Sequence, residues 1–141
     1  MFKLTKILNG KSHAEPIRAK TKSSINYKFG TLLKMSGGVL ANCTPADFPE
    51  YLCGESADAG TKDSILVYPI NEDMIFRAVV TGSPSALSVG DRVQLSVSGG
   101  QARDLTATTE DGVATIIDLE NAESEGDEIL VRFIEIPKET Y

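Results

Sequence analysis

The stretch SILVYPINEDMIFRAVVTGSPSALSVGDRVQL, residues 64–95, carries the most informative pattern in this chain. Two apolar runs rich in β-branched residues, 65–70 and 74–80, flank the turn-forming triplet Asn-Glu-Asp at 71–73. A Gly-Ser-Pro turn then leads to a third run at 92–97. We therefore predict a β-hairpin followed by a return strand, which together form the centre of the fold.

Apolar and polar residues alternate in parts of this stretch, which predicts the side chains that are buried. Successive side chains of a strand point to opposite faces of the sheet, so every second residue shares an environment. We expect Tyr68 and Arg77 nearer the surface. The side chains expected in the core are Ile65, Val67, Phe76, Val79, Val93 and Leu95. Nothing in the stretch is typical of a catalytic site, so it predicts a scaffold.

Short apolar runs continue on both sides of the stretch, with turn signals about every ten residues. Further strands are expected at 24–29, 31–35, 39–40, 101–107, 113–119 and 129–136. Glycine pairs or Asp-Gly predict hairpin turns at 36–38 and 109–112, and Thr44 with Pro45 predicts one helical turn. With almost no helix expected, the pattern indicates an all-β fold, a small antiparallel β-barrel or sandwich.

Charge is divided unevenly along this chain, whose net charge is −6. Residues 1–38 hold eight basic residues and one acidic residue, a net +7, and the remainder carries −13. We interpret 1–22 as an extended basic N-terminal arm, 23–137 as the β-barrel domain and 138–141 as a polar tail. The acidic body would be repelled by nucleic acid, which disfavours direct binding to it. Alternatively, the two charge blocks compensate each other within the fold.

Composition also bears on location and redox state. No apolar run approaches the roughly 20 residues of a membrane-spanning helix, so no membrane association is expected, and the broken apolar run at the N-terminus disfavours a signal peptide. The two cysteines, Cys43 and Cys53, are too few for a disulfide framework. We predict two free thiols in a reducing compartment, with a single bridge as the alternative.

The sequence contains no convincing catalytic, metal or cofactor site. The only histidine, His13, falls in the arm, where a solvated side chain is expected rather than an oriented general base. One histidine and two cysteines leave a zinc site short of ligands. The acidic segment 120–128 departs from EF-hand spacing at Ala122, which favours a solvated loop over a calcium site. We therefore predict that the protein is not an enzyme and holds no cofactor.

Several aromatic residues form another candidate site, a stacking platform for an oligonucleotide on a small barrel. The residues concerned are Tyr27, Phe29, Tyr51, Tyr68 and Phe76. Because basic residues do not interleave with Tyr68 and Phe76, a place in the core is favoured for these rings.

A series of segments in this order resembles a group of phage head proteins. The segments are TLLKMSGGVLANCT (31–44), CGESADAGTKDSILVYPI (53–70), F-x-A-x-V (76–80), SVGDRVQL (88–95), DGVATIID (111–118) and ILVRF (129–133). They resemble the small β-barrel capsid decoration (cement) proteins and head-fibre base proteins of tailed bacteriophages, and the resemblance covers residues 28–136.

This resemblance implies a function without chemistry. Such proteins bind the outer surface of an icosahedral head where capsomers meet, often as homotrimers, and stiffen the shell. It implies a capsid decoration protein located on the virion, present in the host cytoplasm during assembly, with the major capsid protein as partner. The residues expected to meet an acidic capsid surface are Lys3, Lys6, Lys11, Arg18, Lys20, Lys22 and Lys28.

Two other functions remain open at this point. One is a different structural module of the phage, for head completion, tail assembly or fibre attachment. The other is a small barrel that binds a ligand or nucleic acid.

Overall fold

The computed structural model describes residues 1–8 and 14–134, which fold into two antiparallel β-sheets. The strands are β1 (Lys3–Ile7), β2 (Ile17–Lys20), β3 (Leu32–Ser36), β4 (Val39–Asn42), β5 (Tyr51–Cys53), β6 (Ser64–Pro69), β7 (Met74–Val79), β8 (Arg92–Val93), β9 (Leu95–Ser98), β10 (Gln101–Leu105), β11 (Ala114–Asp118) and β12 (Glu128–Arg132). One short 3-10 helix, Pro84–Ala86, follows β7. The all-β prediction is confirmed.

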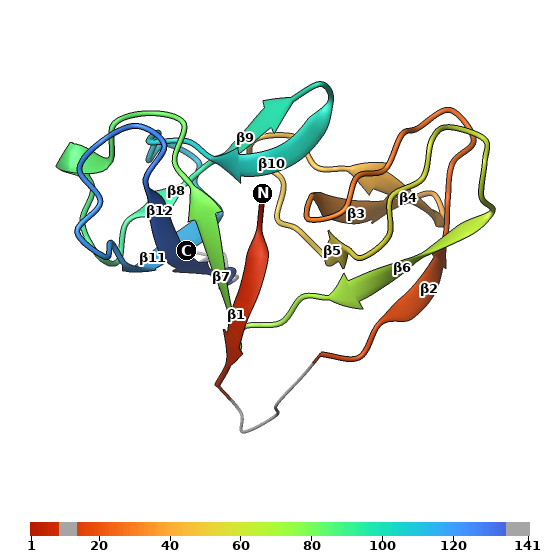
Figure 1. Ribbon diagram of the computed structural model, residues 1–141, viewed down its shortest axis with the longest axis horizontal. Coiled ribbons are helices and arrows are strands. Elements are labelled where there is room, and N and C mark those ends of the chain that lie inside the picture. The colour runs from red at the N-terminus through yellow and green to blue at the C-terminus, as the bar shows by residue number, and fades with distance from the viewer. Residues whose placement is uncertain (9–13, 135–141) are drawn as a thin grey trace, which may run out of the picture.

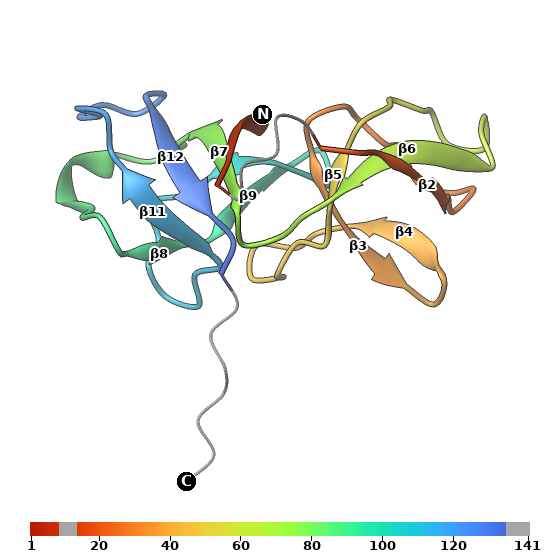
Figure 2. The same ribbon diagram turned by 90° about the horizontal axis from the view of Figure 1, so that it is seen from below.

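The two sheets form two lobes that lie side by side in both views (Figures 1 and 2). The five-stranded sheet has the order β1-β7-β12-β11-β8, and the seven-stranded sheet has the order β2-β6-β5-β3-β10-β9, with β4 paired to β3. Among the described strands, the two edge strands of each sheet do not pair with each other, so neither sheet closes into a barrel. The barrel alternative is therefore wrong, and the arrangement is sandwich-like.

The hairpin predicted for residues 64–80 is wrong, although its turn is present. Asn71 Oδ1 accepts a hydrogen bond from the Asp73 N–H at 2.9 Å, which stabilises the turn. However, β6 pairs with β2 and β5, whereas β7 pairs with β1 and β12. The end of β6 has no N–H group left to pair with β7, because Pro69 lacks an N–H and the Ile70 N–H donates to the Glu50 carbonyl at 2.9 Å. The chain therefore passes from one sheet to the other.

The third run of the stretch also changes sheet. β8 pairs with β11 in the five-stranded sheet, and β9 pairs with β10 in the seven-stranded sheet. Gln94, between them, donates its N–H to the Thr108 carbonyl at 3.0 Å and accepts the Thr106 N–H at 2.9 Å. For the same reason the Asp-Gly turn at 109–112 joins strands of different sheets, so the hairpin predicted there is wrong.

Local hairpins do form at two other places. β3 and β4 pair across Gly37 and Gly38, whose φ angles of +59° and +83° lie in the left-handed region that two-residue hairpin turns need. β11 and β12 pair across the acidic loop, a hairpin that we did not predict from the sequence. No helix in the described residues is long and apolar enough to cross a membrane.

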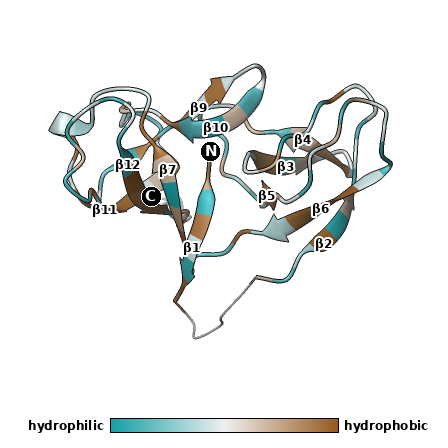
Figure 3. Ribbon diagram, in the orientation of Figure 1, coloured by the Kyte–Doolittle hydropathy of each residue, from teal (hydrophilic) through white to brown (hydrophobic). Residues whose placement is uncertain are grey.

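Two clusters of buried side chains lie between and beneath the sheets. The larger is built around Phe133, whose ring lies 5.4 Å from Phe76, 6.0 Å from Phe2 and 6.5 Å from Phe48, centroid to centroid. The smaller lies under β2, β4 and β6. Figure 3 shows β11 and β12, which supply the larger core, as strongly hydrophobic.

Five of the six core predictions in the stretch are confirmed, and one is wrong. The side chains of Ile65, Val67, Phe76, Val93 and Leu95 are fully buried. Val79 is only half-buried, because the alternation in β7 turns Ala78 and Val80 inward instead. Tyr68 and Arg77 are both partly exposed, as predicted.

The extended N-terminal arm is not evident, because its described parts form strands. β1 pairs with β7 at the edge of the five-stranded sheet, and β2 pairs with β6 at the edge of the seven-stranded sheet. Phe2 and Ala19 are buried in the larger and smaller cores respectively. These buried side chains and the strand pairing together offset part of the cost of ordering a polar, basic segment.

Two other local predictions are wrong. Residues 24–29 form no regular strand; Tyr27 alone bridges Ala57, and its hydroxyl donates to the Leu40 carbonyl at 2.7 Å. At Thr44 the chain makes a turn rather than a helical turn, closed by the Asp47 N–H to the Thr44 carbonyl at 3.1 Å. The tail at 138–141 and His13 lie outside the described residues.

Candidate functional site

Six of the seven basic residues predicted to bind the capsid are in described positions, and all six are exposed. Lys11 lies outside the described residues. The six are Lys3 and Lys6 on β1, Arg18 and Lys20 on β2, and Lys22 and Lys28 in the segment that follows. Since β1 and β2 border different sheets, the structure does not gather these residues into one patch (Figure 1).

Some of this positive charge is compensated inside the fold. Lys3 lies 3.4 Å from Glu128, and Arg18 lies 3.7 Å from Glu55 while also donating to the Ser64 carbonyl at 3.3 Å. Lys6, Lys20, Lys22 and Lys28 make no ion pair with any other described residue. Internal compensation therefore accounts for only part of the basic block.

The tightest lysine contact belongs to Lys34, which was not among the predicted binding residues. Lys34 Nζ donates to Asp47 Oδ2 at 2.6 Å, and the same oxygen accepts the Thr44 N–H at 2.8 Å. Burial alone would raise the pKa of Asp47, but the hydrogen bonds from Lys34 and Thr44 outweigh it and lower that pKa. This pair holds the 44–47 turn against β3.

A groove of about 430 Å³ lies beside β1. Its lining residues are Phe2, Lys3, Leu4, Ala14, Phe29, Leu52 and Tyr68. Lys3 and Leu4 point to opposite faces of their strand, so a groove that touches both follows the edge of β1 rather than one face. The groove is therefore apolar, with one lysine, and it lies along a strand edge.

Two local features shape this groove. The Phe29 side chain is 56% exposed, which is unusual for a large aromatic ring. Tyr68 lies over Gly54, where an added Cβ would come within 2.7 Å of the Tyr68 ring. A glycine at position 54 therefore lets the Tyr68 ring lie close to the backbone. The sequence alone shows a small residue at this position but not the ring that it accommodates.

The aromatic residues weighed as a stacking platform do not share a surface. Tyr27 and Phe76 are buried, in different cores, while Tyr51 and Tyr68 are half-buried and Phe29 is exposed. This confirms the core prediction for Phe76 and Tyr27, and it leaves Phe29 and Tyr68 in the groove.

The acidic loop at 120–128 is organised by its own contacts. Arg77 holds Glu120 through two hydrogen bonds of 2.5 and 2.9 Å, and Asp127 accepts the N–H groups of Glu123 and Ser124, each at 3.0 Å. The two backbone hydrogen bonds lower the pKa of Asp127. No group of three or more metal-ligating side chains is gathered within the described residues.

Both cysteines are buried as free thiols, as predicted. Burial raises the pKa of Cys43 to about 12, and it also raises the pKa of Cys53. Because the thiolate is the reactive form, neither sulfur is activated as a nucleophile.

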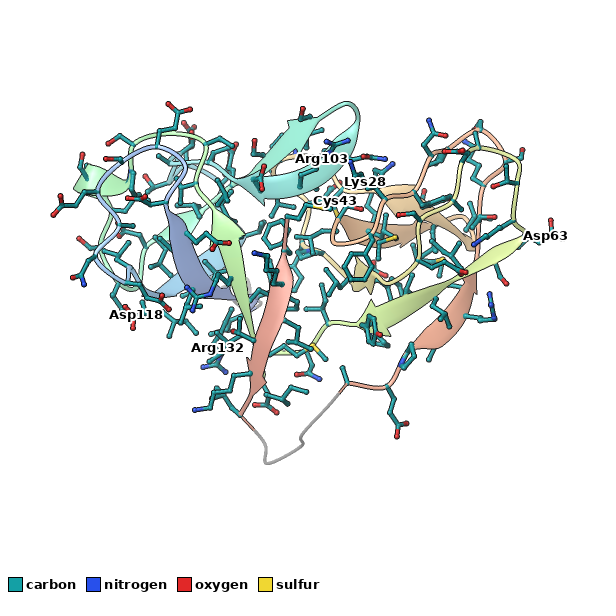
Figure 4. The ribbon with its side chains drawn as sticks, in the orientation of Figure 1. Lys28, Cys43, Asp63, Arg103, Asp118 and Arg132 are labelled. Atoms are coloured by element: carbon teal, nitrogen blue, oxygen red, sulfur yellow. The ribbon has the colours of Figure 1, made fainter. Side chains whose placement is uncertain are left out.

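Figure 4 shows Cys43 and Lys28 toward the centre of the molecule, whereas Asp63 and Asp118 lie at the outer ends of the two lobes.

The fold has a counterpart among solved structures. No protein-family model matches the sequence, and no curated protein sequence matches it. The structure is similar to the N base of head fiber gp8.5 in bacteriophage phi29, with a TM-score of 0.54 and 14% sequence identity. The alignment covers 85% of this chain and 95% of that chain. The sequence resemblance to head-fibre base proteins is thereby confirmed, and this chain has the fold of a phage head-fibre base.

Proposed function

We propose that this protein is a structural component of a tailed-phage virion that attaches to the outer surface of the head, in the manner of a head-fibre base. The observation that carries the proposal is the match in fold to the phi29 head fiber base, which extends over 85% of this chain and nearly all of that chain. A purely structural role is consistent with the buried cysteine thiols and with an acidic loop whose Asp127 carboxylate accepts hydrogen bonds from the loop's own backbone.

The proposed partner is the major capsid protein, and the proposed contacts are basic. Lys6, Lys20, Lys22 and Lys28 are exposed and make no ion pair with other described residues. Exposed charges of this kind speed the encounter with an oppositely charged surface and select orientation. Because Lys6 lies on the edge strand β1 and Lys20 on the edge strand β2, the contact would span both lobes rather than extend along a flexible arm.

A decoration (cement) function is a second candidate that uses the same surface. Both lobes have buried cores, so the body is rigid enough to bridge neighbouring capsomers, and a homotrimer at such a junction is the assembly we propose for it. The two candidates differ in consequence. A cement protein raises the resistance of the head to heat or chelation, whereas a fibre base leaves it unchanged.

Binding to heads tests the shared part of the proposal. Purified protein is mixed with expanded, DNA-free heads of the phage that encodes it, and bound protein is measured after sedimentation. We expect saturable binding with a fixed copy number per head. Binding without saturation, or none, would contradict attachment. The melting temperature of the heads with and without protein then separates cement from fibre base.

A charge-reversal variant tests the proposed contacts. Combining Lys6→Glu, Lys20→Glu, Lys22→Glu and Lys28→Glu should abolish saturable binding, and binding of the unaltered protein should weaken as salt is raised. Lys62→Glu is the control, because Lys62 is exposed but already lies 2.8 Å from Glu55. If the combined variant binds heads as well as the unaltered protein does and keeps its circular dichroism spectrum, these four lysines are not the contact.

A further inference from the structure

One strand edge of the molecule borders an apolar groove. β1 pairs with β7 on one side, and among the described strands it has no partner on the other. The groove beside it is also lined by Leu52 and Tyr68. They belong to β5 and β6, two strands that lie across from β1 in Figure 1. An open strand edge next to apolar side-chain pockets is the arrangement used to bind an extended peptide by strand addition.

The groove leaves large apolar side chains exposed to water. Phe29 at its rim is 56% exposed, and Leu4 is half-buried. Covering either side chain would remove apolar surface from water, which favours binding. Val89 offers a comparison, because its side chain is 62% exposed but lines no part of this groove. Exposure alone therefore does not distinguish the groove; the neighbouring strand edge and the concave apolar lining do.

The charges near the groove specify the kind of segment that fits. Lys3 is the charged residue of the lining, β1 also carries Lys6, and Lys28 directly precedes Phe29. Lys3 is 65% exposed and has one long contact, 3.4 Å to Glu128. A strand with apolar side chains on one face and carboxylates on the other would place its acidic groups near these lysines.

We propose that the groove beside β1 is a docking site for an extended segment of a partner protein in which apolar and acidic residues alternate. The segment adds to the edge of β1 beyond Phe2, whose N–H already donates to the Gly30 carbonyl at 2.9 Å, and places its apolar side chains against Phe29, Leu52 and Tyr68. This inference goes beyond attachment to a head, since it names a site and a peptide chemistry that hold whatever particle carries the protein.

The probe is a blocked octapeptide in which valine alternates with glutamate, titrated into the isotope-labelled full chain. We expect amide resonances of residues 2–7, Phe29, Leu52 and Tyr68 to shift together with one saturation curve. Strand addition should also slow hydrogen exchange in β1. The control peptide, in which valine alternates with lysine, should bind at least about tenfold more weakly.

Variants locate the site. Phe29→Glu should weaken the glutamate peptide by about tenfold or more, because it removes the rim aromatic and adds a like charge. Val89→Glu is the matched control, and it should leave the affinity unchanged. Both positions are exposed, so both variants should keep the wild-type circular dichroism spectrum.

Three results would overturn the proposal. The first is no shift at these residues at millimolar peptide, and the second is equal affinity for the two peptides. The third is self-association of the free chain that Phe29→Glu abolishes, measured by sedimentation, which would assign the groove to a second copy instead. Loss of head binding in a separate assay has no bearing on these outcomes, so failure of the proposed function remains distinguishable.

Discussion

β1 and β2 come from the same basic segment of sequence, yet they contribute to the molecule in different ways. β1 is anchored by Phe2, which is buried against Phe133 in the larger core. β2 is anchored mainly by Ala19, while Ile17 is 44% exposed. Both are edge strands, and both point their lysines outward.

The difference is that both strands pair through their backbones, but only β1 has a large buried side chain beside it, whereas β2 buries an alanine. Burying a phenylalanine contributes far more than burying an alanine, since the apolar area differs several-fold. β1 should therefore be part of the cooperative unit, whereas β2 should be the weaker attachment. Charge alone gives no sign of this, because the two strands look alike in charge.

Removing the β1 anchor should have the largest effect. Phe2→Ala should lower the free energy of unfolding by about 3–5 kcal/mol, because it leaves a cavity beside the Phe133 ring. Urea denaturation followed by circular dichroism measures this change.

The matched variant is Ile17→Ala on β2, which should cost less than about 1 kcal/mol because nearly half of that side chain is exposed. Similar losses for the two variants would show that the strands are held equally. The comparison would then be wrong.

Overpacking beneath β2 should come next in size. Ala19→Leu adds three carbons against Ile65 and Leu33 in the smaller core, both fully buried, and should cost about 1–3 kcal/mol. Lys20→Leu, one residue further on, points outward and should leave the unfolding midpoint nearly unchanged. If Ala19→Leu is tolerated as well as Lys20→Leu, β2 separates from the sheet without cost.

Hairpins show where sequence reasoning about the fold succeeded and failed. At Gly37-Gly38 both positions adopt a positive φ, and β4 pairs with no described strand other than β3, so the local signal decided the pairing. At Asn71–Asp73 the turn chemistry is also present, but Pro69 and the Ile70 hydrogen bond to Glu50 assign β6 elsewhere. A turn signal fixes a change of direction, whereas pairing depends on distant segments.

The candidate site was partly predictable for similar reasons. Exposure of these basic side chains follows from their charge, and the six that are described are exposed, whereas their contact with a capsid stays a prediction. The groove was not predictable, because Phe2 and Phe29 are brought to Leu52 and Tyr68 by contacts between segments far apart in sequence. The one hint in the sequence was the small residue at Gly54, where a Cβ would come too close to the Tyr68 ring.

Lys34 makes an ion pair with Asp47 that holds a turn in place, unlike Lys20 on β2, so the pair is a reference for a lysine that stabilises the fold. A carboxyl group with a lowered pKa in the folded state stabilises the fold above its unfolded pKa, and this is lost as the pH falls through the folded pKa. Asp47→Asn should therefore cost about 1 kcal/mol near neutral pH. The gap to wild type should stay constant down to about pH 5 and close below about pH 4. Denaturation at a series of pH values measures it, and a gap that persists at low pH would contradict the ionic origin.

The smallest effect should come from the exposed lysines of the two strands, where the comparison is sharpest. Lys3→Glu removes the 3.4 Å contact to Glu128 and places two carboxylates together, so it should cost less than about 1 kcal/mol. Lys20→Glu on β2 removes no ion pair to a described residue and should cost still less. Raising the salt concentration should reduce the first loss and leave the second unchanged, because screening acts on close like charges. A larger loss for Lys20→Glu than for Lys3→Glu would mean that the charge on β2, rather than its alanine, holds that strand in place.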